Sequence, residues 1–211
     1  MNKEFRTPRD PAATRQKLID ATVGLILKQG FAATTVDQIC AGAGVTKGSF
    51  FHHFANKEAA GQAAIGWWSD MGTGLYAEAW KDSDGDPLAQ LHCMLDIMTG
   101  FAQPSADPCT CVVGIMSQEV AQSNDALRQS CADALELWTE NVARMLSAAK
   151  ARHPIARDFD PHQVAWFFNS IWQGSMLIAK TVQDPQILIE NVRHSRSYLD
   201  SLFSPSTPQL T

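Results

Sequence analysis

Residues 34–54 contain two short helical patterns joined by a glycine-containing turn, and this arrangement constrains the fold more than any other stretch. In the first pattern, apolar residues recur at the i, i+3, i+4 spacing of one buried helix face, starting at Val36. Gly44 can adopt a positive φ in the turn that follows without strain. In the second pattern, Phe50 and Phe54 lie four residues apart, so they share a face that can anchor the helix to a core. The chain is therefore predicted to form a helix-turn-helix.

The other face of the second pattern carries hydrogen-bond donors. Thr46 can cap this helix with its hydroxyl, and the exposed face then presents Lys47, Ser49, His52 and His53. The major groove of DNA admits a helix, and backbone N–H groups at a helix start favour phosphate. The pattern therefore indicates a helix that reads double-stranded DNA.

The distribution of charge agrees with this interpretation. The 211-residue chain has a formal net charge of −5, which taken alone argues against nucleic acid. Residues 1–60, however, hold eight Lys or Arg and five Asp or Glu, a net charge of +3, which leaves −8 for the remainder. A basic end on an acidic body is typical of a DNA-binding head attached to a separate regulatory domain.

The rest of the chain predicts helices throughout. The first helix is expected to begin at Thr14 as N-cap and to end at Gly30. Asn56 is expected to cap a helix that runs to about Trp80, with glycines that weaken it, and five more helical patterns follow. We therefore expect an all-α protein of about nine helices, with a three-helix head and a helical body.

The last two helical patterns predict a dimer. They begin after Asp160 and Asp184, and each repeats apolar or small residues with 4-3-4-3 spacing. The first of them is apolar nearly all round, so nearly all of its surface has to be covered. We expect a partner subunit to supply that cover through a four-helix interface that includes Ile171 and Leu199.

Many spaced positions in the N-terminal third resemble the TetR/AcrR family of transcriptional regulators. The matching residues are Thr14, Arg15, Ile19, Ala21, Gly30, Phe31, Thr34, Thr35, Val36, Ile39, Ala43, Gly44, Val45, Lys47, Gly48, His53, Phe54, Lys57 and Glu58. The resemblance implies a DNA-binding domain at 12–72 with its helix-turn-helix at about 35–54, and an effector-binding and dimerisation domain at 73–203. It also implies a homodimeric regulator, usually a repressor, that a small hydrophobic or electrophilic effector releases from operator DNA.

The resemblance also indicates which residues contact DNA. Phe51 departs from the family, which usually has a tyrosine here whose hydroxyl contacts a phosphate. Phe51 lacks that hydroxyl, so neighbouring side chains are expected to hold the backbone. The expected DNA contacts are Thr35, Thr46, Lys47, Gly48, Ser49, His52, His53 and Lys57.

Sulfur-containing and aromatic residues of the body form a second candidate site, with two interpretations open. Methionine and aromatic side chains can line an effector cavity or simply fill a core. Cys109 and Cys111 can be buried hydrophobes or thiols that sense electrophiles. Cys111 is the stronger candidate for a sensor, because it lies at an expected helix start, which favours the thiolate. Their spacing does not fit a closed zinc site, so no metal is expected. The candidate residues are Met94, Met98, Phe101, Cys109, Cys111, Met116, Trp138, Trp172 and Met176.

Other features limit the location and the class of the protein. The five cysteines follow no disulfide framework and the N-terminus is polar, so we expect a reducing cytoplasm. The stretch 161–179 is too polar to cross a membrane. No nucleophile elbow or phosphate loop is evident, so neither an enzyme nor a cofactor is expected. The alternatives are a thiol-dependent enzyme and a helical dimerisation module with a degenerate DNA head.

Overall fold

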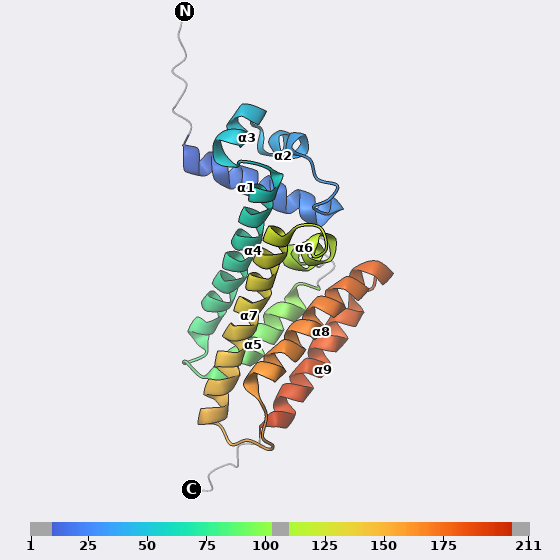
Figure 1. Ribbon diagram of the computed structural model, residues 1–211. Coiled ribbons are helices and arrows are strands. Elements are labelled where there is room, and N and C mark those ends of the chain that lie inside the picture. The colour runs from blue at the N-terminus through green and yellow to red at the C-terminus, as the bar shows by residue number, and fades with distance from the viewer. Residues whose placement is uncertain (1–9, 103–109, 204–211) are drawn as a thin grey trace, which may run out of the picture.

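The computed structural model describes residues 10–102 and 110–203, and within these ranges the chain is all-α. Figure 1 shows α1, α2 and α3 as a head at one end, while α4 and α7 run from the head along the body and α8 lies beside α9. The elements are α1 (Pro11–Gln29), α2 (Val36–Ala43), α3 (Lys47–His53), α4 (Lys57–Ala79), a 3₁₀ turn η1 (Trp80–Asp82), α5 (Pro87–Gly100), α6 (Val112–Val120), α7 (Asp125–Arg152), α8 (Pro161–Val182) and α9 (Gln186–Leu202). The predicted fold class is confirmed.

Side-chain caps define most of the helix starts. Thr46, Asn56 and Asp160 each accept a hydrogen bond from a backbone N–H of the first turn, as predicted. The expectation for the first helix was wrong, because Asp10, and not Thr14, is its N-cap. The Asp10 side chain accepts from the backbone N–H of Ala12, and a proline follows at the first helical position, which favours an earlier start.

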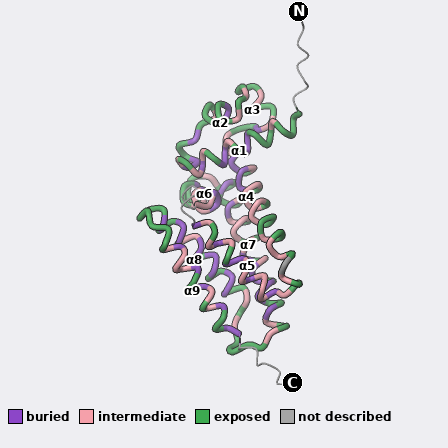
Figure 2. The backbone as a smooth tube through the Cα atoms, turned by 180° about the vertical axis from the view of Figure 1, so that it is seen from behind, coloured by how far each residue is buried: buried purple, intermediate pink, exposed green. Residues whose placement is uncertain are grey.

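The buried apolar residues form two clusters. The first extends across the junction of head and body. It joins Leu18, Ile39 and Phe50 of the head to residues of α4, to Met116 of α6 and to Leu127 of α7. The second cluster fills the body between α5, α7, α8 and α9. In Figure 2, the residues coloured as buried lie mainly on the inner sides of these helices. The head is therefore packed onto the body through α4, α6 and α7.

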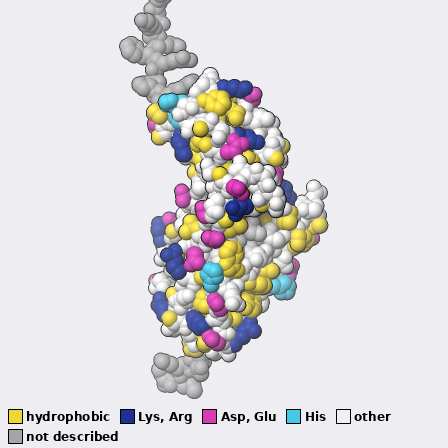
Figure 3. All heavy atoms as spheres, viewed as in Figure 1, with side chains coloured by type: hydrophobic (Ala, Val, Ile, Leu, Met, Phe, Trp, Pro, Cys, Tyr) yellow, Lys and Arg dark blue, Asp and Glu magenta, His cyan; other side chains and the backbone are white. Residues whose placement is uncertain are grey.

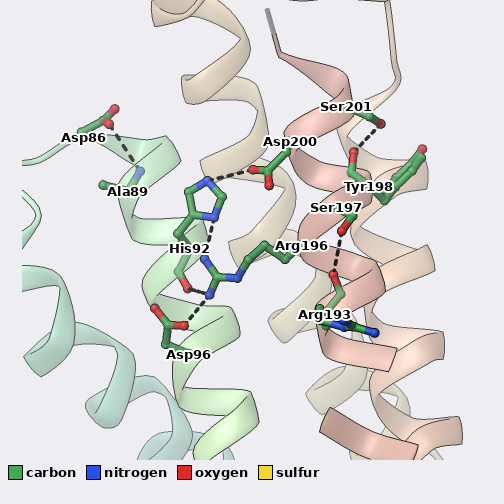
Figure 4. A network of polar contacts seen from close by, with 10 residues as sticks. All are labelled: Asp86, Ala89, His92, Asp96, Arg193, Arg196, Ser197, Tyr198, Asp200 and Ser201. Atoms are coloured by element: carbon green, nitrogen blue, oxygen red, sulfur yellow. Dashed lines mark hydrogen bonds and ion pairs between the residues drawn. The ribbon is translucent and has the colours of Figure 1, made fainter. Parts of the chain in front are cut away.

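A polar network fixes α9 against α5 (Figure 4). One guanidinium nitrogen of Arg196 lies 3.0 Å from Nδ1 of His92, and the other donates to the His92 carbonyl oxygen at 3.1 Å and to Asp96. Since a guanidinium has no acceptor, Nδ1 accepts, and Nε2–H is left to donate to Asp200 at 3.3 Å. Burial lowers the pKa of His92, which agrees with this neutral tautomer.

The two C-terminal helices differ from the prediction in one respect. The apolar stripe of α9 is buried within the protomer, and Leu199 is fully buried there, so the expectation that Leu199 lies in a subunit interface was wrong. A stripe with 4-3 spacing does not reveal which neighbour covers it, and here α5 and α8 do. Large apolar side chains of α8 remain exposed, namely Trp166, Phe167, Leu177, Ile178 and Val182.

Gly61 of α4 lets the side chains of Phe31 and Met116 approach the α4 backbone closely at the junction of head and body. A Cβ atom there would lie 2.7 Å from Cε2 of Phe31 and 3.2 Å from Cε of Met116. Phe31 is buried and Met116 fully so, and each belongs to the first cluster. Any side chain at this position would therefore separate α4 from the start of the α1–α2 connection.

We expect Gly61→Ala to lower the free energy of unfolding by about 1–2 kcal/mol, because overpacking outweighs the better helix propensity of alanine. Gly66→Ala is the matched control on the same helix, since a Cβ there would meet nothing within 4 Å. It should raise stability by up to about 1 kcal/mol. Urea unfolding of both variants would measure the difference, and equal effects would contradict the close approach.

Candidate nucleic-acid interface and body cavity

The helix-turn-helix is held together by caps and by two aromatic anchors. The Thr35 hydroxyl and the Gln38 side chain form a reciprocal capping box at the start of α2. Gly44 ends α2 with φ of 65°, a left-handed conformation that glycine adopts without strain. Phe50 of α3 and Phe54, the C-cap residue of that helix, are buried in the head core. The predicted turn and anchors are therefore present, and α3 is fixed with one face outward.

The residues expected to contact DNA lie on the outward side of the head. Thr35, Thr46, Lys47, Gly48 and His52 are exposed, and Ser49 and His53 are half-buried. In Figure 1, α3 lies in the head, away from the body, and Figure 3 shows histidine and basic side chains on the surface of that end. A helix face carrying hydroxyl, ammonium and imidazole donors can contact phosphates and base edges in a major groove.

Lys47 forms an ion pair with Asp37. The Lys47 Nζ lies 2.8 Å from Oδ1 of Asp37, and both side chains are mostly exposed. The hydrogen bond to Asp37 raises the pKa of Lys47, so the lysine remains charged. Sequence reasoning missed Asp37 because its proximity to Lys47 depends on the angle between α2 and α3. A phosphate contact by Lys47 requires exchange of this partner.

Lys57 has a role inside the chain. Its Nζ donates to the carbonyl oxygens of Phe31 at 3.1 Å and Thr34 at 3.0 Å, and it lies 4.4 Å from the centre of the Phe31 ring. The ammonium group thereby holds the connection between α1 and α2.

Phe51 is 54% exposed on α3, with its ring edge-on to Phe50, so it presents an apolar ring at the outer surface.

A cavity of about 380 Å³ lies in the body, between α4, α5, α7 and α8 and the start of α6. Six of the predicted residues line it: Met94, Phe101, Cys111, Trp138, Trp172 and Met176. The prediction was wrong for Met98, which packs in the body core, and for Met116, which packs in the core shared with the head. Cys109 lies outside the described residues. Spacing places a methionine on a face but does not tell which of two cores that face meets.

Sequence reasoning missed the contribution of α4 and η1 to the cavity. Trp68, Tyr76 and Trp80 line it, and their spacing of eight and four residues was the available signal. The Tyr76 hydroxyl accepts from the indole Nε1–H of Trp138 at 3.4 Å. Burial raises the pKa of Tyr76, which keeps the phenol protonated.

The Cys111 thiol does not have the expected tendency to ionise. It lies at the start of α6, where Gln173 Nε2 donates to its Sγ at 3.8 Å. Burial raises its pKa, so desolvation outweighs the helix start and the predicted preference for thiolate was wrong. Among the described residues, no three His, Cys, Asp or Glu side chains come together as metal ligands.

The far end of α6 contacts the head. Oε2 of Glu119 accepts a hydrogen bond from the backbone N–H of Ala32 at 2.9 Å. Its other carboxylate oxygen occupies the space above Gly30, where a Cβ would lie 2.1 Å away and where φ is +87°. Thus α6 begins at the cavity and ends on the α1–α2 connection.

No helix in the described ranges is long and apolar enough to cross a membrane.

Comparison with known families matches both parts of the chain. Residues 18–59 match the model described as bacterial regulatory proteins of the tetR family, and residues 87–195 match the tetracyclin repressor-like C-terminal domain. The transcriptional regulator AcuR of Cereibacter sphaeroides is 30% identical over 179 residues, covering 85% of this chain and 82% of AcuR. The transcriptional repressor DhaR of Mycobacterium sp. strain GP1 is 28% identical over 176 residues, covering 83% and 84%.

The solved structures agree. The regulatory protein TetR from Rhodobacter sphaeroides superimposes with a TM-score of 0.75 at 29% identity, over 90% of this chain and 98% of that one. The reduced form of NemR from E. coli, at 22% identity, shares the fold with a TM-score of 0.78, over 92% and 99%. These matches, together with the helix-turn-helix and the helical body, show that the chain belongs to the TetR family of bacterial transcriptional regulators.

Proposed function

We propose that this regulator is a homodimeric repressor that a small molecule releases from its operator. The observation that carries the proposal is the helix-turn-helix with an outward donor face, joined through α4 and α6 to a body that contains a cavity. The name of DhaR, a repressor, supports the sign of regulation. The site of action is the cytoplasm, where bacterial operators lie.

The proposed domains share one helix. The DNA-binding domain takes residues 12–72 and the effector-binding domain residues 73–203. Because α4 runs without interruption from Lys57 to Ala79, this boundary lies inside a helix. Ligand-dependent movement of the cavity wall would therefore reach the head through α4 as well as through α6. Such a change needs an effector with different affinities for two conformations.

The proposed DNA contacts are those of the outer face of α3 and the caps beside it. Thr35, Thr46, Gly48, Ser49, His52 and His53 supply hydroxyl, backbone and imidazole groups close to the groove. Lys47 supplies a phosphate contact after leaving Asp37, which lies 2.8 Å away. Lys57 supports the interface by holding the α1–α2 connection.

Selection from random double-stranded DNA should enrich a palindromic operator, and failure to enrich any sequence would contradict the proposed function. On that operator Lys47→Ala should weaken binding and reduce the slope of log affinity against log salt by about 0.9 for each phosphate that the lysine neutralises in the parent. Lys28→Ala, which removes the same charge from the last turn of α1, is the control and should leave the slope close to that of the parent.

Asp37→Asn should strengthen operator binding, because it frees the Lys47 ammonium group to contact a phosphate.

The proposed dimer interface is the outward stripe of α8. Phe167, Ile171, Gly174, Ile178 and Val182 repeat at helical spacing, and a Cβ at Gly174 would meet nothing within 4 Å. Phe167, Ile178 and Val182 are between 43% and 56% exposed in the single chain. A stripe of apolar residues with a small residue at its centre suits close packing against a second copy of the same helix.

Ile178→Glu should therefore give folded monomers that bind the operator weakly, because the dimer would bury an unpaired carboxylate. Leu137→Glu is the matched control, since Leu137 of α7 is 49% exposed against 48% for Ile178. Sedimentation velocity and circular dichroism would measure assembly and folding separately. An Ile178→Glu variant that sediments as a dimer would contradict this interface.

The Glu119 contact offers a test of the coupling between cavity and head. Glu119→Ala removes the acceptor for Ala32 N–H, whereas Glu119→Gln removes the charge but keeps an acceptor. We expect Glu119→Ala alone to weaken operator binding, by about threefold to tenfold, since the loosened head has to be ordered on DNA. Faster hydrogen exchange at Ala32 should accompany the loss. Equal operator affinities for the two variants would contradict the coupling.

A further inference from the structure

The cavity offers an anionic ligand no buried cation. Among its described lining residues the only charged side chain is Arg144, which is exposed and donates to Oδ1 of Asn141. A carboxylate that enters this interior without a cation loses its hydration uncompensated. The described lining also contains no Asp or Glu that could pair with a cation, so it selects against charged compounds of either sign.

Aromatic rings give the cavity flat surfaces. Tyr76 and Trp80 stack with ring centroids 6.0 Å apart and an interplanar angle of 16°. Phe101 and Trp172 meet edge to face, with centroids 6.1 Å apart. Planar molecules can stack on such rings or meet them edge to face.

Tyr76 offers a hydrogen-bond donor. Its oxygen accepts from the Trp138 indole N–H at 3.4 Å, which leaves the O–H proton available for another partner. No acceptor for this proton is found among the described residues. A buried O–H proton without an acceptor is costly, so a ligand atom that accepts it gains affinity.

Asn169 offers the opposite group. The two hydrogens of its Nδ2 are used within the protein, by the Leu135 carbonyl oxygen at 3.2 Å and the Thr139 hydroxyl at 2.9 Å. Asn169 lines the cavity, so its Oδ1 is the group left for a ligand. This amide orientation is fixed by its two acceptors.

From these four observations, we propose that the cavity binds an uncharged, planar aromatic compound. A carbonyl or ester oxygen of the compound accepts from the Tyr76 hydroxyl, and a hydroxyl or N–H group donates to Oδ1 of Asn169. The inference rests on the proposed function in treating this compound as the effector. Binding itself can be measured in the absence of DNA.

Methyl 6-hydroxy-2-naphthoate and 6-hydroxy-2-naphthoate form a suitable pair of probes, since they share the ring and the hydroxyl and differ in charge at pH 7. Calorimetric titration of the full chain should give an affinity for the ester more than about tenfold that for the carboxylate. Tyr76→Phe should weaken ester binding by about threefold to tenfold. Tyr198→Phe is the matched control, because Tyr198 is the other tyrosine of the chain and does not line the cavity.

Three results would overturn the inference: no binding of the ester, a carboxylate that binds as tightly as the ester, or equal effects of Tyr76→Phe and Tyr198→Phe. Thermal unfolding of both variants would establish that each is folded. Release of the selected operator by the ester is measured separately, by gel shift. An ester that binds without releasing DNA would contradict the proposed regulation and leave the ligand class supported.

Discussion

The position of the head depends on the contacts made by the connection between α1 and α2. Lys57 of α4 binds two of its carbonyl oxygens, and Glu119 of α6 accepts from the Ala32 amide. The Phe31 side chain lies against Gly61 at a distance that leaves no room for another Cβ. Two helices that line or border the cavity thus converge on one short backbone segment. In the proposed function, this arrangement is the route by which a change in the body reaches α3 without any contact between ligand and DNA-binding residues.

Local signals in the sequence predicted the head well because the head is built from local contacts. The caps at Thr46 and Asn56, the left-handed Gly44 and the Phe50 and Phe54 anchors each depend on residues close in sequence. Only Thr14 failed as a cap, because a competing Asp-Pro pair begins the helix earlier. The fold class followed from periodicity, which the nine helices of the described ranges confirm.

The sites were less predictable because they depend on how helices pack. The Lys57 ammonium, expected at the surface, is occupied by two carbonyl oxygens that only tertiary structure brings within reach. Met98 and Met116 have the same spacing signal as Met94 but face two different cores. Leu199 illustrates the same limit, since a heptad-like stripe packs equally well within a chain or between chains. Burial also reversed the expected ionisation of Cys111.

The ion pair between Lys47 and Asp37 has a consequence for the search along a chromosome. A lysine that is paired with a carboxylate has to give up that pair to bind a phosphate, so it contributes less binding free energy than an unpaired lysine. Binding to random DNA sequence is weakened as a result. At a correct site, the proposed base-edge contacts of α3 would compensate for loss of the carboxylate. The genome contains a very large excess of non-specific sites. A lower affinity for them shortens the time that the protein spends bound at each one. An acidic residue in a DNA-binding face can therefore increase selectivity without touching a base.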